Sequence, residues 1–301
     1  MKIGIDLGGS HIAIGVVDEN GRIIEKQERR ILDKEKQEIK TFIEEYIIKN
    51  IKEMSKKYKI TNIGIAIPGT VNKTSVIKSV NLNLENYNIV EALKKKINIP
   101  IKIKNDAKCA ALAENKYGSL KDYKRSIFIG LGTGIGGAVI VDDKLLDTGD
   151  LPGCEIGHMI IQKDGLECKC GKKGCFEKYA SMKAFKTNLR KELNLDETTR
   201  GEELLNILRN NNENNKNYKK IEKIVNDYID YLSIGISNLI NIFEPEAIVI
   251  GGSFVYFEDV LLNRLYKKII EGNLLFNKRD SLIIKLAVLG NDAGIIGASL
   301  L

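Results

Sequence analysis

The sequence predicts an α/β protein made of two related lobes around a cleft, and two internal similarities support this. Residues 5–18 and 129–142 match at Ile, Leu, Gly, Val and Asp, and each reads as an apolar strand, a glycine turn and a second strand. The tripeptide Asn-Asp-Ala occurs at residues 105–107 and again at residues 291–293. The matches keep their order, and the number of residues between each position and its match grows along the chain. We therefore expect a duplicated unit with an insertion in the second copy.

The first lobe is expected over residues 1–117, in the order strand, strand, strand, helix, strand, helix, strand, helix. Asn20-Gly21 is a strong hairpin signal between the second and third strands. Apolar side chains over residues 39–58 follow the spacing of an amphipathic helix, and Asn105-Asp106 would cap a helix over residues 107–117. The strands are expected at residues 1–7, 12–18, 22–29, 62–67 and 101–104, with a short helix at residues 89–97.

The second lobe is expected over residues 118–289, with its insertion at about residues 149–216. The insertion contains a loop rich in cysteine and glycine and two helical stretches, at residues 182–193 and 201–210. A long amphipathic helix at about residues 218–242 resumes the repeat. A C-terminal helix at about residues 290–301 is a candidate to pack back on the first lobe.

Charge and cysteine usage narrow the class of protein. The 301 residues include 47 basic and 40 acidic ones, and the basic residues are scattered, so we expect no nucleic-acid partner. The number of cysteines is odd, five, and four of them lie between residues 149 and 181, which favours a reducing compartment and a metal over disulfides. No apolar run approaches the roughly 20 residues that span a membrane, and the first strand begins too early for a signal peptide. We therefore expect a cytoplasmic protein without a membrane partner.

Four soft metal ligands gather between residues 149 and 181, namely His158, Cys168, Cys170 and Cys175. Zinc prefers a tetrahedron of thiolate sulfur and imidazole nitrogen, and a structural site uses protein groups at all four positions. Gly171 and Gly174 lie between the cysteines, where a chain that folds back on an ion needs tight turns. The alternative is that unrelated buried thiols lie beside an ordinary histidine. The spacing favours structural zinc.

Glycine turns in both lobes predict a nucleotide in the cleft, because glycine lets backbone N–H groups approach phosphate oxygens. Either turn alone is weak support, since glycine-rich hairpins are common without ligands. A third close approach of the backbone, to the adenosine end of the nucleotide, is expected at Gly251 and Gly252, which follow a buried strand. The alternative is that these glycines only form a tight strand-to-helix turn. The first two turns comprise Asp6, Gly8, Gly9 and Ser10, and Gly132, Thr133, Gly134 and Gly136.

These motifs resemble those of the ROK (repressor, open reading frame, kinase) family, which contains sugar kinases and transcriptional repressors. The resemblance covers essentially the whole chain and is most specific at E-I-G-H (residues 155–158) and C-x-C-G-x-x-G-C-F-E (residues 168–177). It implies the sugar-kinase/actin-like ATPase (ribonuclease H-like) fold, with ATP, Mg²⁺ and structural Zn²⁺ as cofactors. It also implies a homodimer, or alternatively a tetramer. The implied site residues are Asp106 as catalytic base, Asn105, Glu155, His158 and Glu177 on the sugar hydroxyls, and Gly69 and Asn81 lining the sugar pocket.

The chemistry of phosphoryl transfer supports these roles separately. Transfer of the γ-phosphoryl group of ATP to a hydroxyl requires an acceptor for the hydroxyl proton, and Asp106 can be that acceptor. The alternative is a plain helix cap, and we expect that structural role for Asp292 in the second Asn-Asp-Ala. Asp6 is expected near the phosphates or Mg²⁺, with a strand-end turn as the alternative.

We expect transfer to the 6-hydroxyl of glucose, because the E-I-G-H motif with the intact cysteine set is most like the family's glucokinases. N-Acetylmannosamine kinase is the next interpretation, followed by allose or fructose kinase. Cys154 and Tyr87 depart from the family pattern, are expected beside the sugar, and leave its identity open. A sugar-responsive repressor is disfavoured because the first strand begins at residue 2, which leaves no helix-turn-helix segment before it. A sugar-sensing or actin-like ATPase would not need Asp106 together with two more carboxylates.

Overall fold

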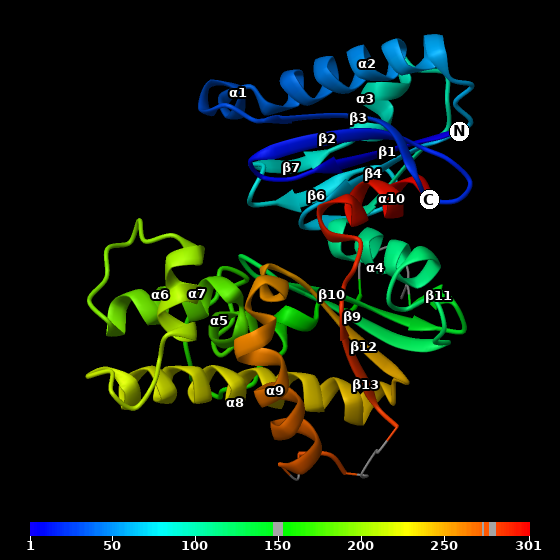
Figure 1. Ribbon diagram of the computed structural model, residues 1–301. Helices are drawn as coiled ribbons and strands as arrows, with labels where there is room; N and C mark the ends of the chain where they lie inside the picture. The colour runs from blue at the N-terminus through cyan, green and yellow to red at the C-terminus, as the bar shows by residue number, and fades with distance from the viewer. Residues whose placement is uncertain (147–152, 273, 277–280) are drawn as a thin grey trace. The chain divides into compact units, whose positions relative to one another are not determined.

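The computed structural model describes residues 1–146, 153–272, 274–276 and 281–301 (Figure 1). The chain forms two compact units. Unit 1 contains Met1–Tyr123, Ile140–Cys154 and Val288–Leu301, and unit 2 contains Lys124–Val139 and Glu155–Ala287. Unit 1 thus includes a segment, Ile140–Cys154, that we assigned to the second lobe. Residues 149–152, at the start of the expected insertion, lie outside the described residues.

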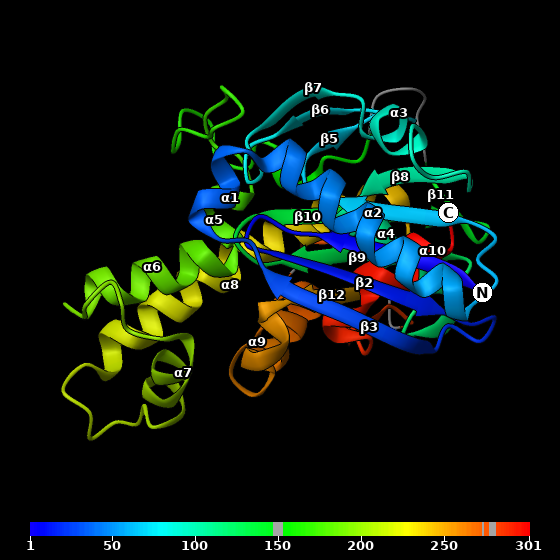
Figure 2. The same ribbon diagram turned by 90° about the horizontal axis from the view of Figure 1, so that it is seen from above.

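Unit 1 is built on a five-stranded sheet with helices on both faces (Figures 1 and 2). Its strand order is β3-β2-β1-β4-β8, with β1, β2 and β3 antiparallel and β4 and β8 parallel to β1. The strands are β1 (Lys2–Leu7), β2 (His11–Val17), β3 (Ile23–Arg30), β4 (Ile63–Ile67) and β8 (Ile101–Asn105). The main helices are α2 (Ile39–Lys57) and α3 (Ile89–Lys94) over one face, and α4 (Asp106–Tyr117) and α10 (Ala293–Ser299) over the other.

Helix α2 covers the sheet through an apolar stripe. Ile43, Ile47, Ile51 and Met54 recur every three or four residues and are all buried in one cluster with Ile5 and other strand residues. Burial of one such side chain contributes about 1.5–3 kcal/mol. The helix expected from this spacing is therefore present, and its apolar face holds it on the sheet.

Helix α10 lies directly on the opposite face. A Cβ atom on Gly4 would lie 1.8 Å from the carbonyl oxygen of Ile295, and one on Gly64 would lie 1.8 Å from that of Ala298. Only glycine leaves room for this contact, so a substitution at Gly4 would displace the helix. The end of the chain is thus part of unit 1.

Glu114 of helix α4 fixes the segment that leads into α10. Its side chain is fully buried, and its Oε1 accepts hydrogen bonds from the N–H groups of Val288 (3.0 Å) and Leu289 (2.9 Å). Its Oε2 accepts from the N–H of Ser119 (2.8 Å). A buried carboxylate is tolerated only when hydrogen-bonded in this way, so Glu114 ties two chain segments together.

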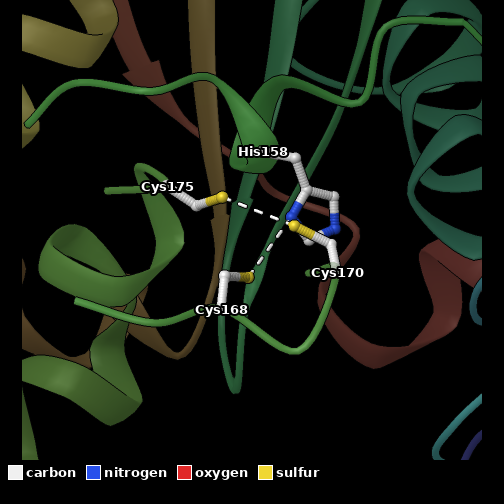
Figure 3. A group of neighbouring side chains, drawn as sticks. All are labelled: His158, Cys168, Cys170 and Cys175. Atoms are coloured by element: carbon white, nitrogen blue, oxygen red, sulfur yellow. Dashed lines mark hydrogen bonds between the residues drawn. The ribbon is translucent and has the colours of Figure 1, made fainter. Parts of the chain in front are cut away.

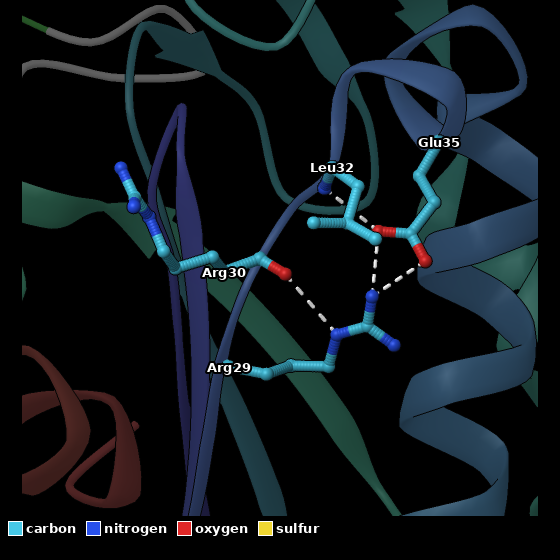
Figure 4. A network of polar contacts seen from close by, with 4 residues as sticks. All are labelled: Arg29, Arg30, Leu32 and Glu35. Carbon is cyan, nitrogen blue, oxygen red and sulfur yellow. Dashed lines mark hydrogen bonds and ion pairs between the residues drawn. The ribbon is translucent and has the colours of Figure 1, made fainter.

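A short helix that the sequence analysis did not predict, α1 (Asp33–Gln37), precedes α2. Five residues are too few for a helix to be stable by itself. Figure 4 shows the contacts that hold it: Arg29 of β3 donates to Glu35 Oε2 at 2.6 Å, and the same oxygen accepts the N–H of Leu32 at 2.8 Å. The Arg29 guanidinium also lies 4.9 Å from the ring centroid of Phe42. Tertiary contacts therefore stabilise α1.

The expected element order of the first lobe is wrong between residues 70 and 87, where an additional antiparallel sheet occurs. It consists of β5 (Thr70–Val71), β6 (Val76–Ser79) and β7 (Leu84–Tyr87). Strands of two to four residues are too short to show a period-two pattern. Tyr87 is buried, and its hydroxyl donates to Glu44 Oε1 of α2 at 2.6 Å. These contacts place Tyr87 in the core against α2, whereas we expected it beside the sugar.

A second five-stranded sheet, in the order β11-β10-β9-β12-β13, repeats the first. β12 is parallel to β9 and β13, as β4 is to β1 and β8, which confirms the predicted duplication. The strands are β9 (Arg125–Leu131), β10 (Ile135–Val141), β11 (Lys144–Leu145), β12 (Ala247–Gly252) and β13 (Ile283–Leu286).

The helices of unit 2 include the three predicted from the sequence. They are α5 (Glu177–Ala180), α6 (Met182–Glu192), α7 (Gly201–Arg209), α8 (Tyr218–Phe243) and α9 (Glu258–Glu271). The long helix α8 contacts α5, α6 and α9. Across the described parts of the chain, no helix combines the length and apolarity needed to cross a membrane.

Candidate active site

In unit 1, the β1–β2 turn carries the first group of predicted nucleotide residues. Asp6 lies near the end of β1, and the N–H of Gly8 donates to the carbonyl oxygen of His11 at 2.8 Å, which closes the turn. A Cβ atom on Gly9 would lie 2.9 Å from Cβ of Asn81. The predicted phosphate turn and the predicted sugar residue Asn81 are therefore neighbours. Ser10 follows on the exposed side of the turn.

Asn105 and Asp106 lie where β8 ends and α4 begins. The Asn105 side chain caps the helix, with Oδ1 accepting from the N–H of Lys108 at 3.2 Å, and its Nδ2 donates to the carbonyl oxygen of Gly69 at 3.0 Å. The N–H of Ala107 donates to Asp106 Oδ1 at 2.8 Å. Because β4 and β8 are parallel, their carboxyl ends meet at one edge of the sheet, which brings Gly69 beside Asn105.

The carboxylates of Asp6 and Asp106 interact. Burial, followed by the negative charge of Asp106, raises the pKa of Asp6 to about 7, although the positive charge of Lys26 acts in the opposite direction. Burial also raises the pKa of Asp106, against the hydrogen bond from Ala107 that lowers it. A carboxylate with a raised pKa is a better proton acceptor at neutral pH. Two such groups also suit a hard divalent cation, which takes oxygen ligands.

The second Asn-Asp-Ala has a different environment. Asp292 Oδ1 lies 2.8 Å from Nζ of Lys26, which also lies 2.9 Å from Oε2 of Glu28. Asp292 belongs to a short 3₁₀ turn, Gly290–Asp292, before α10. It is thus engaged in an ion pair on β3, whereas Asp106 begins a helix of 12 residues.

In unit 2, the β9–β10 turn contains the second group of predicted nucleotide residues, with Thr133 and Gly136 exposed. The N–H of Gly132 donates to the carbonyl oxygen of Gly134 at 3.0 Å. A Cβ atom on Gly132 would meet no described atom within 4 Å, so packing does not require glycine there. The open space beside this backbone is what close approach of a phosphate needs.

Helix α6 begins against this turn, a contact that the sequence analysis missed. The N–H of Lys183 donates to the carbonyl oxygen of Gly132 at 3.0 Å. Ser181 caps the helix by accepting the N–H of Ala184 at 3.1 Å. This serine was the available sequence signal for the start of the helix, but it does not indicate which turn the helix contacts.

Gly251 and Gly252 end the neighbouring strand β12. Gly251 pairs with Gly130 and Gly252 with Leu131 in the parallel ladder, so this turn lies beside the β9–β10 turn. Gly252 has φ 74°, a backbone conformation that favours glycine. The turn predicted to contact adenosine therefore lies beside the second predicted phosphate turn, at one edge of the sheet.

The four predicted metal ligands converge in unit 2 (Figure 3). One ligand atom from each of His158, Cys168, Cys170 and Cys175 lies within 4.8 Å of the others. Cys168 Sγ is 3.7 Å from His158 Nδ1, and Cys170 Sγ is 3.5 Å from Cys175 Sγ. Zinc–sulfur bonds of about 2.3 Å in a tetrahedron place ligand atoms about 3.8 Å apart. The donor set and its spacing therefore fit zinc.

The backbone between the cysteines supports this geometry. Gly171 and Gly174 have φ 90° and 83°, so the chain turns back at both positions. The N–H of Cys168 donates to the carbonyl oxygen of Lys172 at 2.8 Å, which closes the first turn. Burial raises the pKa of Cys168 to about 12 and also raises that of Cys175. Thiolates at these positions therefore need a neighbouring cation.

Of the predicted sugar residues in this loop, His158 belongs to the cysteine cluster, Glu177 contacts it and Glu155 precedes the turn that carries His158. Glu155 is exposed and immediately precedes the 3₁₀ turn Ile156–His158, and its carbonyl oxygen accepts the N–H of His158 at 3.0 Å. Glu177 Oε1 lies 3.2 Å from Cys168 Sγ and 3.8 Å from His158 Nδ1. A Cβ atom on Gly134 would lie 2.5 Å from Glu177 Oε2. Glu177 is therefore in contact with both the cluster and the glycine turn.

Cys154 precedes Glu155 in a left-handed conformation, with φ 61°. Its Sγ lies 3.7 Å from the carbonyl oxygen of Leu146. A non-glycine residue with positive φ is uncommon and is held by its surroundings.

Comparisons with known proteins agree with these motifs. A family model described as "ROK family" matches residues 2–301. A glucokinase of Streptomyces coelicolor is 30% identical over 99% of this chain and 96% of its own length, and a xylose repressor of Bacillus subtilis is 28% identical over 99% of this chain and 76% of its own length.

Solved structures have the same fold. A ROK family glucokinase from Streptomyces griseus, in complex with glucose and AMPPNP, superposes with a TM-score of 0.81 at 25% identity, covering 99% of this chain and 97% of that one. A Listeria monocytogenes protein to which N-acetylmannosamine kinase activity is attributed superposes with a TM-score of 0.82 at 26% identity, covering 100% and 98%. The two-lobed actin-like ATPase fold of these kinases is therefore the fold of this chain.

Proposed function

This chain belongs to the ROK family and is an ATP-dependent sugar kinase, and we propose that its acceptor is the 6-hydroxyl of a hexose, with glucose preferred. The observation that carries the proposal is the arrangement at the carboxyl edge of the first sheet. There Asp106 lies at the start of a helix, beside Asn105, Gly69 and the carboxylate of Asp6. This set joins a proton acceptor to polar groups that bind hydroxyls.

Asp106 is the proposed catalytic base. Its hydrogen bond from Ala107 orients the carboxylate, and its raised pKa increases its basicity toward the sugar hydroxyl. Asn105, Glu155, His158 and Glu177 are proposed to hold the other hydroxyls, since each carboxylate can accept hydrogen bonds from two vicinal hydroxyls. Gly69 and Asn81 are proposed to line the sugar site.

The nucleotide is proposed to bind the glycine turns. Backbone N–H groups of Gly8–Ser10 and of Gly132–Gly134 would contact phosphate oxygens, and the turn at Gly251-Gly252 would contact the adenosine end. Asp6 would lie near the Mg²⁺ ion that accompanies ATP, which when bound neutralises phosphate charge. The open space beside Gly132 supports this assignment.

His158, Cys168, Cys170 and Cys175 are proposed to hold a structural zinc ion, which when bound supplies a rigid cross-link and no open coordination position. Glu177 contacts Cys168 directly, and Glu155 precedes the turn that carries His158. The loop that holds the metal therefore also sets the positions of the proposed sugar residues. We further propose that the protein is cytoplasmic and forms a homodimer, with a tetramer as the alternative. Sedimentation analysis would test the oligomeric state.

A coupled assay of ADP release tests the substrate. The panel should contain glucose, fructose, allose and N-acetylmannosamine, and we expect the highest kcat/KM with glucose. A higher value with N-acetylmannosamine would favour the activity attributed to the Listeria relative. Turnover of ATP that is independent of every sugar would contradict the kinase assignment. Because a xylose repressor is also similar, binding of the protein to DNA fragments should be measured in parallel.

A further inference from the structure

Helix α6 has basic residues near its N-terminus. Lys183 lies in its first turn, Lys186 follows one turn later, and the first turn contains no acidic residue. The N-terminal end of a helix carries partial positive charge, so cations are unfavourable there. An anion bound nearby would relieve this repulsion.

Lys186 is held in a specific place. Its Nζ lies 3.4 Å from Oγ of Ser253 and 5.1 Å from the ring centroid of Phe257, and its side chain is half-buried. Burial lowers its pKa, and the charge of Arg190 lowers it further. Within the described residues, no carboxylate forms an ion pair with it. An ammonium has three donors, and Ser253 accepts only one, so the remaining donors can bind a ligand.

The position of Lys186 relates it to both glycine turns of unit 2. The carboxyl ends of β9 and β12 lie side by side, and ligands of α/β sheets bind outside such ends. At one end, the N–H of Lys183 is bonded to Gly132, and at the other the Lys186 ammonium contacts Ser253. The first two turns of α6 therefore extend along this sheet edge from the phosphate turn to the turn assigned to adenosine.

We propose that Lys186 is a further nucleotide-binding residue, whose ammonium pairs with the phosphate group attached to the ribose. This inference rests on the proposed kinase function and deepens it. The phosphate nearest the ribose belongs between the turn at Gly132 and the turn at Gly251–Ser253, which is where Lys186 lies. A lysine ammonium suits a phosphate as a compact point charge.

Calorimetric titration with ADP, AMP and adenosine tests the proposal without requiring turnover. Lys186→Met removes the charge and keeps most of the stem that packs on Phe257. It should weaken ADP and AMP binding about 10-fold, as expected for the loss of a charged hydrogen bond, and change adenosine binding less than about twofold. Lys186→Arg should retain most of the affinity. Lys191→Met, at an exposed position in the last turn of the same helix, is the matched control and should bind like the wild type.

Three results would overturn the inference. Unchanged ADP affinity in Lys186→Met would mean that the lysine only packs against Ser253 and Phe257. Equal weakening of ADP and adenosine would place the contact on the nucleoside. A wild-type protein that binds no ADP would remove the kinase assignment itself and the inference with it. Thermal unfolding of each variant identifies a folding defect, and the salt dependence of ADP binding, steeper in the wild type than in Lys186→Met, gives a second readout of the charge.

Discussion

The candidate residues of unit 1 and those of unit 2 are held in place by different means. In unit 1, Asp6 and Asn105 lie at strand ends and Asp106 begins a helix, so the hydrogen bonds of a whole sheet fix them. In unit 2, His158 and Glu177 lie in elements of only three and four residues. Elements this short are not stable by themselves. The unit 2 residues therefore need a cross-link, which a metal bound at the cysteine cluster can supply.

The largest expected effect tests the chemistry of the unit 1 residues. Asp106→Asn retains the shape of the side chain and its place at the start of α4 but removes the proposed proton acceptor. Turnover should fall at least about 100-fold, while sugar affinity and unfolding temperature change little. Steady-state kinetics and sugar titration measure these quantities. Turnover within a few-fold of the wild type would show that another group accepts the proton.

The next effect tests the cross-link of the unit 2 residues. Cys168→Ser or Cys175→Ser should abolish bound zinc, which elemental analysis should find at about one ion per wild-type chain. Sugar phosphorylation should weaken by about 10- to 100-fold, as is typical when groups oriented by a metal are disturbed. ADP affinity should persist.

Hydrogen exchange compares the two units directly in the same experiment. Removal of the metal should speed exchange at residues 156–177 and leave the N–H groups of β1, β4 and β8 protected. A metal-free preparation with full activity and unchanged exchange would contradict the proposed role of the cluster. Cys109→Ser, in the buried core of unit 1 and outside the cluster, is a control that should keep its zinc.

A smaller effect concerns pH and unit 1. The pKa of Asp6 is raised to about 7, so between pH of about 4 and 7 the folded chain binds more protons there than the unfolded chain. The free energy of unfolding should therefore fall as pH rises through this window. Asp6→Asn should remove on the order of 1–2 kcal/mol of that fall, since partial exposure reduces the full effect. Urea unfolding at pH 5 and 7.5 would check it, and identical slopes in both proteins would contradict it.

The smallest effect belongs to the second Asn-Asp-Ala. Asp292→Asn removes an ion pair with Lys26. The side chain of Asp292 is 46% exposed and that of Lys26 is 30% exposed. Such partly exposed pairs contribute up to about 1 kcal/mol, so stability should fall slightly and turnover should stay within about twofold. A larger loss of turnover than in Asp106→Asn would mean that the catalytic copy is the second one.

Much of this arrangement could be predicted from the sequence because it depends on local patterns. The apolar spacing of residues 39–58, the hairpin dipeptide Asn20-Gly21 and the cap at Asn105 each act within a few residues. The clustering of His158, Cys168, Cys170 and Cys175 could be predicted because they lie within 18 residues of one another. Patterns of this range are visible without knowing the fold.

The remainder depends on contacts between distant segments. The strands of residues 70–87 are too short to show alternation, and α1 exists because Arg29 on another element binds Glu35. Tyr87 was expected beside the sugar, but the position of α2 directs its hydroxyl to Glu44. The contact of Glu177 with Gly134 likewise requires the β9–β10 turn and the cysteine loop to be placed together, which no local pattern specifies.

The contact of α10 with the first sheet has a consequence for biosynthesis. A ribosome makes β1, β2 and β4 first, yet the face that contains Gly4 and Gly64 is covered by residues made after the whole of unit 2. This face of nascent unit 1 therefore stays without its C-terminal helix until residues 124–139 and 155–287, which form unit 2, have been made. Incompletely covered strands are prone to aggregate. Loss of residues 288–301 by a premature stop would thus leave the part of the chain translated earliest as the part that fails to fold.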